Sequence, residues 1–280
     1  MFAEIPLPWL TVMAFVLGAL LGSFINVVIV RLPVMLMLQW RQEARDALAL
    51  PEEEVARYNL CTPRSQCPSC RQPIAWHDNL PLIGWFKRRG RCAHCQARIS
   101  VQYPLIELMA GLLMASVIIV HGATWSALAW SGLCLTLLVL AIIDLRTQLL
   151  PDIITLPLLW AGLLYQLFFQ PFMLENAVVG AMAGYVLLWS FYWLFKWLTK
   201  KEGMGYGDFK LLAALGAWLG WTMLPILLML SAGLGAIIGG LLQLSLPRLR
   251  GMPLPFGPFL ALAGWVAVLF GAPLRAWTGL

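Results

Sequence analysis

The sequence predicts an all-α polytopic membrane protein, a bundle of about eight transmembrane helices with a small cytoplasmic zinc-binding insertion. Of its 280 residues, 61% are hydrophobic and only 11% are charged, a balance far from that of soluble domains. The apolar stretches are continuous and do not alternate with polar residues, which favours helices over the strands of a membrane barrel. One polar insertion holds two cysteine pairs, and this pattern predicts the zinc site.

Eight stretches are candidate membrane-crossing helices, since a span needs about 20 mostly apolar residues. They lie at residues 9–30, 104–121, 124–143, 153–169, 177–198, 209–222, 224–246 and 256–272. Two of them are short, so seven is the alternative count. The expected organisation is a first transmembrane helix at 1–31, a cytoplasmic insertion at 32–103 with the zinc site, and a transmembrane bundle at 104–280.

The basic residues predict the orientation of the helices, because short cytoplasmic loops hold most Lys and Arg residues. With the N-terminus on the periplasmic side, all basic residues except Arg275 fall in or beside four cytoplasmic segments, which are 31–103, 144–152, 199–208 and 247–255. The net charge of +6 then reflects topology and attraction to anionic membrane lipid. The sequence holds no nucleic-acid-binding motif, so no nucleic acid is expected as a partner.

The insertion contains two Cys-x-x-Cys pairs within "CPSCRQPIAWHDNLPLIGWFKRRGRCAHC". Two such pairs close a tetrahedral zinc site, and four thiolates leave no position for a catalytic water, so the zinc is expected to be structural. Disulfides are the less favoured alternative, because the insertion should face the reducing cytoplasm. His77 and His94 are substitute ligands that the four cysteines make unnecessary, and Cys61 has no paired partner. The predicted ligands are Cys67, Cys70, Cys92 and Cys95.

Acidic residues at membrane depth are costly and mark function by default. Asp144 ends the third predicted helix, where neither capping nor the helix dipole explains a negative charge. Asp208 follows Gly205 and Gly207, which permit a sharp turn before a helix begins; the alternative is that Asp208 only caps that helix. Lys210 is either part of this motif or an anchor at the membrane interface.

A pair of carboxylates that share one proton can hydrolyse a peptide. One carboxylate activates water as a base, while the other polarises the scissile carbonyl as an acid. If Asp144 and Asp208 face one another, the sequence predicts such a pair at the cytoplasmic edge of the bundle. Their helix ends suggest that Asp208, near a helix N-terminus, carries the negative charge and that Asp144 carries the proton.

At these residues the sequence closely resembles the type IV prepilin peptidases, also called prepilin leader peptidase/N-methyltransferases. The resemblance covers essentially the whole chain, and the ordered set of motifs is far more specific than Gly-x-Gly-Asp alone. It includes the cysteine pairs and "GSFINVVIVRLP", "YPLIELMAG", "IDLRTQLLPDIITLPLLWAGLL", "KEGMGYGDFKLLAALGAW" and "PFGPFLALAGW".

The resemblance implies an inner-membrane aspartic protease that cuts the basic leader from prepilins or type II secretion pseudopilins after a glycine, on the cytoplasmic side. Asp144 and Asp208 match the catalytic pair of the family, with Gly205, Gly207 and Lys210 in the same motif. The family also implies N-methylation of the new N-terminus with S-adenosylmethionine. Residues that bind this methyl donor are not identified; the region around Gly90 and the cysteine pairs is the only candidate.

Other classes fit the same residues less well. A peptidase that does not methylate is the nearest alternative. A presenilin-type protease also uses Gly-x-Gly-Asp, but it leaves the cysteine insertion unexplained. A proton-coupled transporter would place paired carboxylates near mid-bilayer, whereas Asp144 and Asp208 lie near one face. A zinc-binding membrane adaptor would leave Asp144 without a purpose.

Overall fold

The computed structural model of the chain describes residues 6–51, 58–201, 204–245 and 254–278. Parts of the predicted cytoplasmic segments, at 52–57, 202–203 and 246–253, therefore lie outside the described residues. The chain forms two compact units, Met1–Gly122 and Ala123–Leu280. Each unit is built from helices, and only two isolated β-bridges occur in the described part of the chain.

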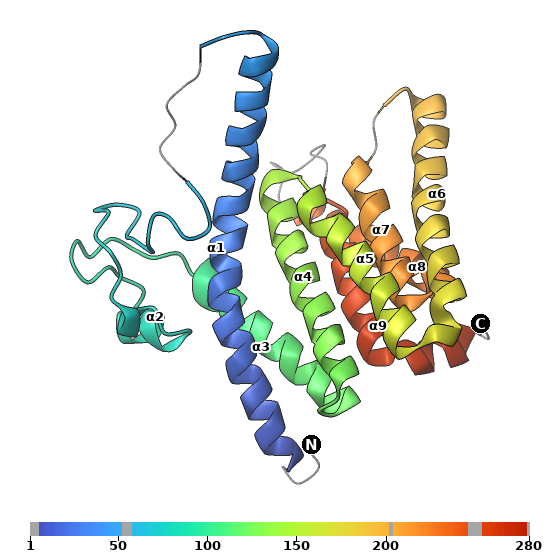
Figure 1. The fold of residues 1–280 in the computed structure, drawn as a ribbon, viewed down its shortest axis with the longest axis horizontal. Coiled ribbons are helices and arrows are strands. Elements are labelled where there is room, and N and C mark those ends of the chain that lie inside the picture. Colours follow the sequence, from blue (N-terminus) through green and yellow to red (C-terminus); the bar gives the residue numbers. More distant parts are fainter. Residues whose placement is uncertain (1–5, 52–57, 202–203, 246–253, 279–280) are drawn as a thin grey trace. The chain divides into compact units, whose positions relative to one another are not determined.

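The first unit is a pair of long helices with a loop-rich insertion between them in sequence. Helix α1 (Leu7–Ala47) and helix α3 (Gln102–His121) pack side by side (Figure 1). Glycines allow this close approach: a Cβ atom at Gly18 would lie 2.5 Å from the Ala110 carbonyl oxygen, and one at Gly22 would lie 2.8 Å from the Cα atom of Glu107. Small residues at a helix contact are typical of membrane helices, where packing replaces the hydrophobic effect as the driving force.

Helix α1 continues past residue 31, the predicted end of the first span, to Ala47. At 1.5 Å per residue its 41 residues extend about 60 Å, roughly twice the thickness of a hydrocarbon core. The insertion beyond α1 contains a short 3₁₀ helix, η1 (Trp76–Asp78), and helix α2 (Ile83–Lys87). The boundaries predicted at residues 31 and 103 separate membrane-crossing segments from the cytoplasmic insertion. The packing of α3 on α1 does not test these boundaries.

The second unit is a bundle of six helices, counted over the residues that the structure describes. They are α4 (Trp125–Thr147), α5 (Asp152–Phe169), α6 (Leu174–Thr199), α7 (Tyr206–Leu219), α8 (Leu224–Ser245) and α9 (Gly257–Thr278). The 3₁₀ helices η2 (Pro171–Met173) and η3 (Trp221–Met223) join α5 to α6 and α7 to α8. Helix α7 packs against α5, α6 and α9 (Figure 1), and most of its residues are buried.

Seven helices in the described residues are long and apolar enough to cross a membrane. The stretch predicted at 209–222 forms α7, whose 14 residues rise only about 21 Å and cannot span a hydrocarbon core of about 30 Å alone. The all-α membrane fold is therefore confirmed, with the lower of the two predicted counts for full-length spans. Many large apolar side chains on the other helices are exposed, as expected where lipid is the solvent.

Candidate active site and metal centre

Asp144 lies one turn before the end of α4, with its side chain turned into the second unit. The residue is only 5% exposed. Helix α4 ends at Thr147, and the backbone N–H of its left-handed C-cap residue, Gln148, donates to the Asp144 carbonyl oxygen at 2.9 Å. The Asp144 carboxylate oxygen Oδ2 accepts a hydrogen bond of 3.0 Å from the backbone N–H of Gly257, the first residue of α9.

Asp208 lies in the first turn of α7 and is 6% exposed. The N-cap of this helix is Gly205, and no side chain caps it. The alternative reading of Asp208 as a simple cap is therefore not supported. Its oxygen Oδ1 is buried and has no hydrogen-bond partner among the residues that the structure describes. A buried carboxylate oxygen without a partner is costly and calls for a role beyond stability.

The two carboxylates line the same pocket, of about 240 Å³. Gly205 and Gly207 also line the pocket, whereas Lys210 does not. The other lining residues are Gln148, Leu150, Met204, Leu254, Pro255 and Phe256. The structure thus brings together four of the five residues that the sequence analysis assigned to this site.

Gly257 is the site residue that the sequence analysis did not single out. A Cβ atom there would lie 2.5 Å from Oδ2 of Asp144, so only glycine allows the backbone N–H to approach this carboxylate. Leu150 requires a second glycine nearby, since a Cβ atom at Gly207 would lie only 2.6 Å from the Cβ atom of Leu150. The only hint in the sequence was the motif "PFGPFLALAGW", which contains Gly257.

The contact with Gly257 changes the argument about charge. From the sequence, Asp208 was expected to carry the negative charge because it lies near a helix N-terminus, and Asp144 the proton because it lies at a helix C-terminus. However, Asp144 also faces the N-terminus of α9 through Gly257. A helix N-terminus therefore faces each carboxylate, and helix ends alone do not distinguish the base from the acid.

Lys210 forms an ion pair at the edge of this region. Its ammonium group lies 2.7 Å and 2.6 Å from the two carboxylate oxygens of Asp152, the first residue of α5. This pair ties the first turns of α5 and α7 together, and it is partly exposed. The structure thus gives Lys210 a partner other than Asp144 or Asp208.

The four predicted cysteine ligands gather in the first unit, with all their sulfur atoms within 4.8 Å of one another. The Cys67 and Cys95 sulfurs are 3.7 Å apart, and the Cys70 and Cys92 sulfurs 3.9 Å. These distances are far too long for disulfides. They match the edge of a tetrahedron with metal–sulfur bonds of about 2.3 Å, which is about 3.8 Å. The cluster could therefore hold a metal ion.

The two cysteine pairs have the same local backbone. The N–H of Cys67 donates to the Gln72 carbonyl oxygen, and that of Cys92 donates to the Ala97 carbonyl oxygen, each at 2.9 Å. Each loop closes in an antiparallel bridge, Gln66 with Pro73 and Arg91 with Arg98. Backbone N–H groups of Cys70 and Ser69 lower the pKa of the Cys67 thiol to about 6, which favours its thiolate, whereas desolvation and the neighbouring cysteines raise the pKa of Cys70 to about 11.

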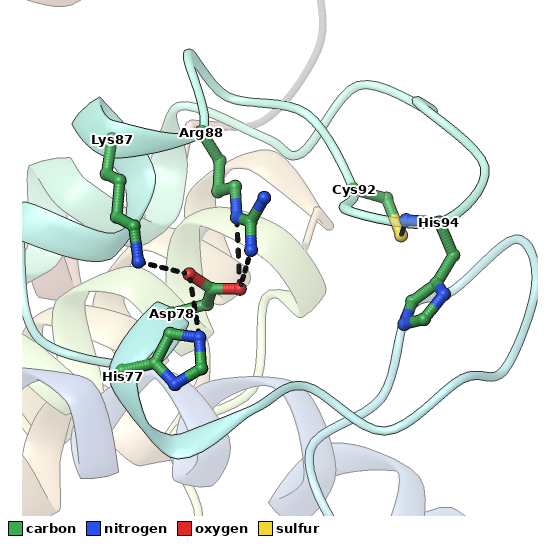
Figure 2. Close-up of polar contacts among 6 residues, drawn as sticks. All are labelled: His77, Asp78, Lys87, Arg88, Cys92 and His94. Atoms are coloured by element: carbon green, nitrogen blue, oxygen red, sulfur yellow. Dashed lines mark hydrogen bonds and ion pairs between the residues drawn. The ribbon is translucent and has the colours of Figure 1, made fainter.

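An ion-pair cluster centred on Asp78 holds the segment between the cysteine pairs. Figure 2 shows Lys87 and Arg88 converging on its carboxylate, with Arg88 donating at 3.0 Å and 2.6 Å. These hydrogen bonds from Arg88 lower the pKa of Asp78 to about 2. His77 also contacts Asp78, at 3.7 Å, and His94 reaches Cys92 through its backbone N–H. Neither histidine belongs to the described metal-ligand cluster.

Comparisons with known proteins agree with this two-part architecture. The model of the bacterial peptidase A24 N-terminal domain matches residues 16–121, and that of the type IV leader peptidase family matches residues 131–240. The first match contains the four clustered cysteines, and the second contains both pocket aspartates. No solved structure matches the chain.

Several relatives share about half of their residues with this chain. A prepilin leader peptidase/N-methyltransferase of Aeromonas hydrophila is 52% identical over 97% of this chain and 94% of the relative. Proteins with the same name from Stutzerimonas stutzeri and Pseudomonas putida are each 50% identical over 94% of this chain, covering 91% and 92% of the relatives. Identity at this level along nearly the whole length, with the family-model match around both aspartates, shows that the chain belongs to the type IV leader peptidase family.

Proposed function

We propose that this protein is an aspartic peptidase that removes the basic leader from prepilins or type II secretion pseudopilins and then methylates the new N-terminal amine. Cleavage takes place after a glycine, at the cytoplasmic face of the bacterial inner membrane. The observation that carries the proposal is the pair of buried carboxylates, Asp144 and Asp208, lining one pocket. The names of the relatives support the substrate and both activities.

The carboxylates act as one unit in hydrolysis. The ionised member takes a proton from water, whose oxygen bonds to the scissile carbonyl carbon, while the protonated member gives its proton to the carbonyl oxygen. The C–N bond then breaks as the leaving nitrogen takes the proton that the first carboxylate removed from water, while a hydroxyl proton of the tetrahedral intermediate returns to the second carboxylate and restores the pair. With one shared proton the pair carries a single negative charge. The substrate amide is neutral, so the buried pocket holds only this one charge during the reaction.

The first unit serves the methylation. S-adenosylmethionine would supply the methyl group: the amine nitrogen would bond to the methyl carbon as its bond to sulfur breaks, S-adenosylhomocysteine would leave, and the amine would lose a proton. Cys67, Cys70, Cys92 and Cys95 would hold zinc, which would stabilise the insertion and take no part in this chemistry, since four thiolates would leave no position for a reacting group. The orientation follows from the basic residues, with the N-terminus periplasmic and both sites cytoplasmic.

A proton-coupled transporter fits the site less well. A transport pathway must be open to each side of the membrane in turn, with its carboxylates near mid-bilayer. Asp144 instead lies one turn from the end of α4, and Asp208 lies in the first turn of α7. These positions favour a reaction at one membrane face.

Product mass tests the proposal. The purified full-length chain in detergent is incubated with a prepilin and S-adenosylmethionine, and the product is weighed by mass spectrometry. We expect loss of the leader together with gain of one methyl group. Loss of the leader without the methyl group would leave a peptidase alone, and an uncut prepilin would contradict the proposal.

The Gly257→Ala variant should lose most of its peptidase activity. Its added methyl would lie 2.5 Å from Oδ2 of Asp144, so this carboxylate must move and loses its backbone donor. A displacement of about 1 Å in a catalytic group can lower the rate by about 10²-fold. The rate of prepilin cleavage measures the effect. Gly132→Ala is the matched control, because nothing in the described structure lies within 4 Å of the added methyl; equal activity in the two variants would contradict the prediction.

A further inference from the structure

Two glycines beside the pocket are required by packing. A Cβ atom at Gly257 would meet the carboxylate of Asp144, and one at Gly207 would lie 2.6 Å from the Cβ of Leu150. Neither neighbour can withdraw easily, since the first is held by a hydrogen bond and the second is a Cβ atom bonded directly to the backbone. The fold itself therefore explains these two glycines.

Packing does not require glycine at Gly205. Its backbone angles, φ −82° and ψ 149°, are those of ordinary extended chain, which every residue adopts. The nearest atom that a Cβ would meet, within the described part of the chain, is Oδ2 of Asp208 at 3.8 Å. This distance is ordinary van der Waals contact, so alanine fits at this position without strain.

Gly205 is the N-cap of α7. At this position glycine is nearly as favourable as serine or aspartate, whereas alanine is much less favourable, so capping would permit serine here as well as glycine. Gly205 is exposed and lines the pocket beside Asp208. The missing side chain thus leaves space at one place, next to a buried carboxylate whose Oδ1 has no partner in the described structure.

We infer that Gly205 is a specificity-determining residue, whose bare α-carbon makes room for the substrate residue at the cleaved bond. The inference rests on the proposed peptidase function. A reacting carbonyl must come within about 3–3.5 Å of the attacking group. A methyl group at position 205 would stand 3.8 Å from the Asp208 carboxylate and would occupy the space through which the peptide backbone approaches.

A substitution in the enzyme, combined with one in the substrate, tests the inference. Wild type and Gly205→Ala are assayed on two prepilins, one with the natural glycine before the cleaved bond and one with alanine there. An added methyl in a tight pocket lowers kcat/KM by about 10-fold or more. We expect such a loss for Gly205→Ala on the glycine substrate. On the alanine substrate the variant should lose more than the product of the two single changes, because both methyl groups compete for one space.

Thermal unfolding separates this role from a structural one. Gly205→Ser keeps a favoured N-cap residue and should melt with wild-type protein while losing kcat/KM as Gly205→Ala does. The control Gly132→Ala should also melt with wild type, whereas Gly207→Ala should melt lower because of its clash with Leu150. A lowered melting temperature for Gly205→Ser would show that the fold requires glycine here and would overturn the inference. So would wild-type kcat/KM on both substrates.

The aspartate variants distinguish a failure of the inference about Gly205 from a failure of the proposed peptidase function. If Asp144→Asn and Asp208→Asn are inactive while Gly205→Ala cleaves both substrates normally, the inference is wrong and the peptidase assignment stands. If either asparagine variant cleaves at the wild-type rate, the proposed function is wrong, and the inference falls with it.

Discussion

Asp144→Asn and Asp208→Asn each abolish prepilin cleavage, with an expected loss of at least about 10²–10⁴-fold, the usual contribution of a positioned general acid or base. Asparagine keeps the size of the side chain but can neither take a proton from water nor share one. Because the two carboxylates act as a unit, the double variant should be no worse than either single variant. Cleavage rates of the purified proteins measure the effect.

Asp152→Asn is the matched control for these variants. It makes the same chemical change at an acidic residue that pairs with Lys210 and does not line the pocket. An exposed ion pair contributes at most about 1 kcal/mol, so cleavage by this variant should stay close to wild type. Cleavage at the wild-type rate by Asp144→Asn or Asp208→Asn would refute the paired-carboxylate mechanism.

The sequence was sufficient to predict residues whose chemistry conflicts with their surroundings. Asp144 stood out because a carboxylate at the C-terminal end of an apolar helix has no stabilising role. The four cysteines stood out because their spacing repeats and matches a tetrahedral site. In both cases the residues carry the information themselves, before any tertiary contact is known. The structure places Asp144 and Asp208 in the lining of one pocket and gathers the four cysteine sulfurs within 4.8 Å of one another.

The sequence could not predict contacts between distant segments. The hydrogen bond from Gly257 to Asp144 joins residues 113 positions apart, and it changed the argument about which aspartate is charged. Likewise, the sequence alone suggests that Lys210 is an interface anchor, whereas in the structure it pairs with Asp152 of α5. The three glycines of the site look alike in sequence, and only the neighbours of each missing Cβ separate Gly205 from the other two.

Replacement of one metal-binding cysteine tests the other half of the protein. Cys67→Ser or Cys92→Ser should lose the bound zinc and unfold the insertion, because these two residues are the buried members of the cluster. Binding of a structural zinc contributes about 10–16 kcal/mol in small zinc-finger peptides, more than the limited core of this insertion can replace. Elemental analysis of the purified variants gives the zinc content, and hydrogen exchange of residues 58–101 reports unfolding.

Cys61→Ser is the control, since Cys61 is exposed and stands outside the cluster of four. It should keep stoichiometric zinc and wild-type exchange. In Cys67→Ser, α4–α9 should keep their exchange protection, because they form a compact unit of their own, while methylation is lost with the insertion. Retained zinc and unchanged exchange in Cys67→Ser would disprove the four-cysteine site. If Cys61→Ser also released zinc, the metal would have to be held by a different set of ligands.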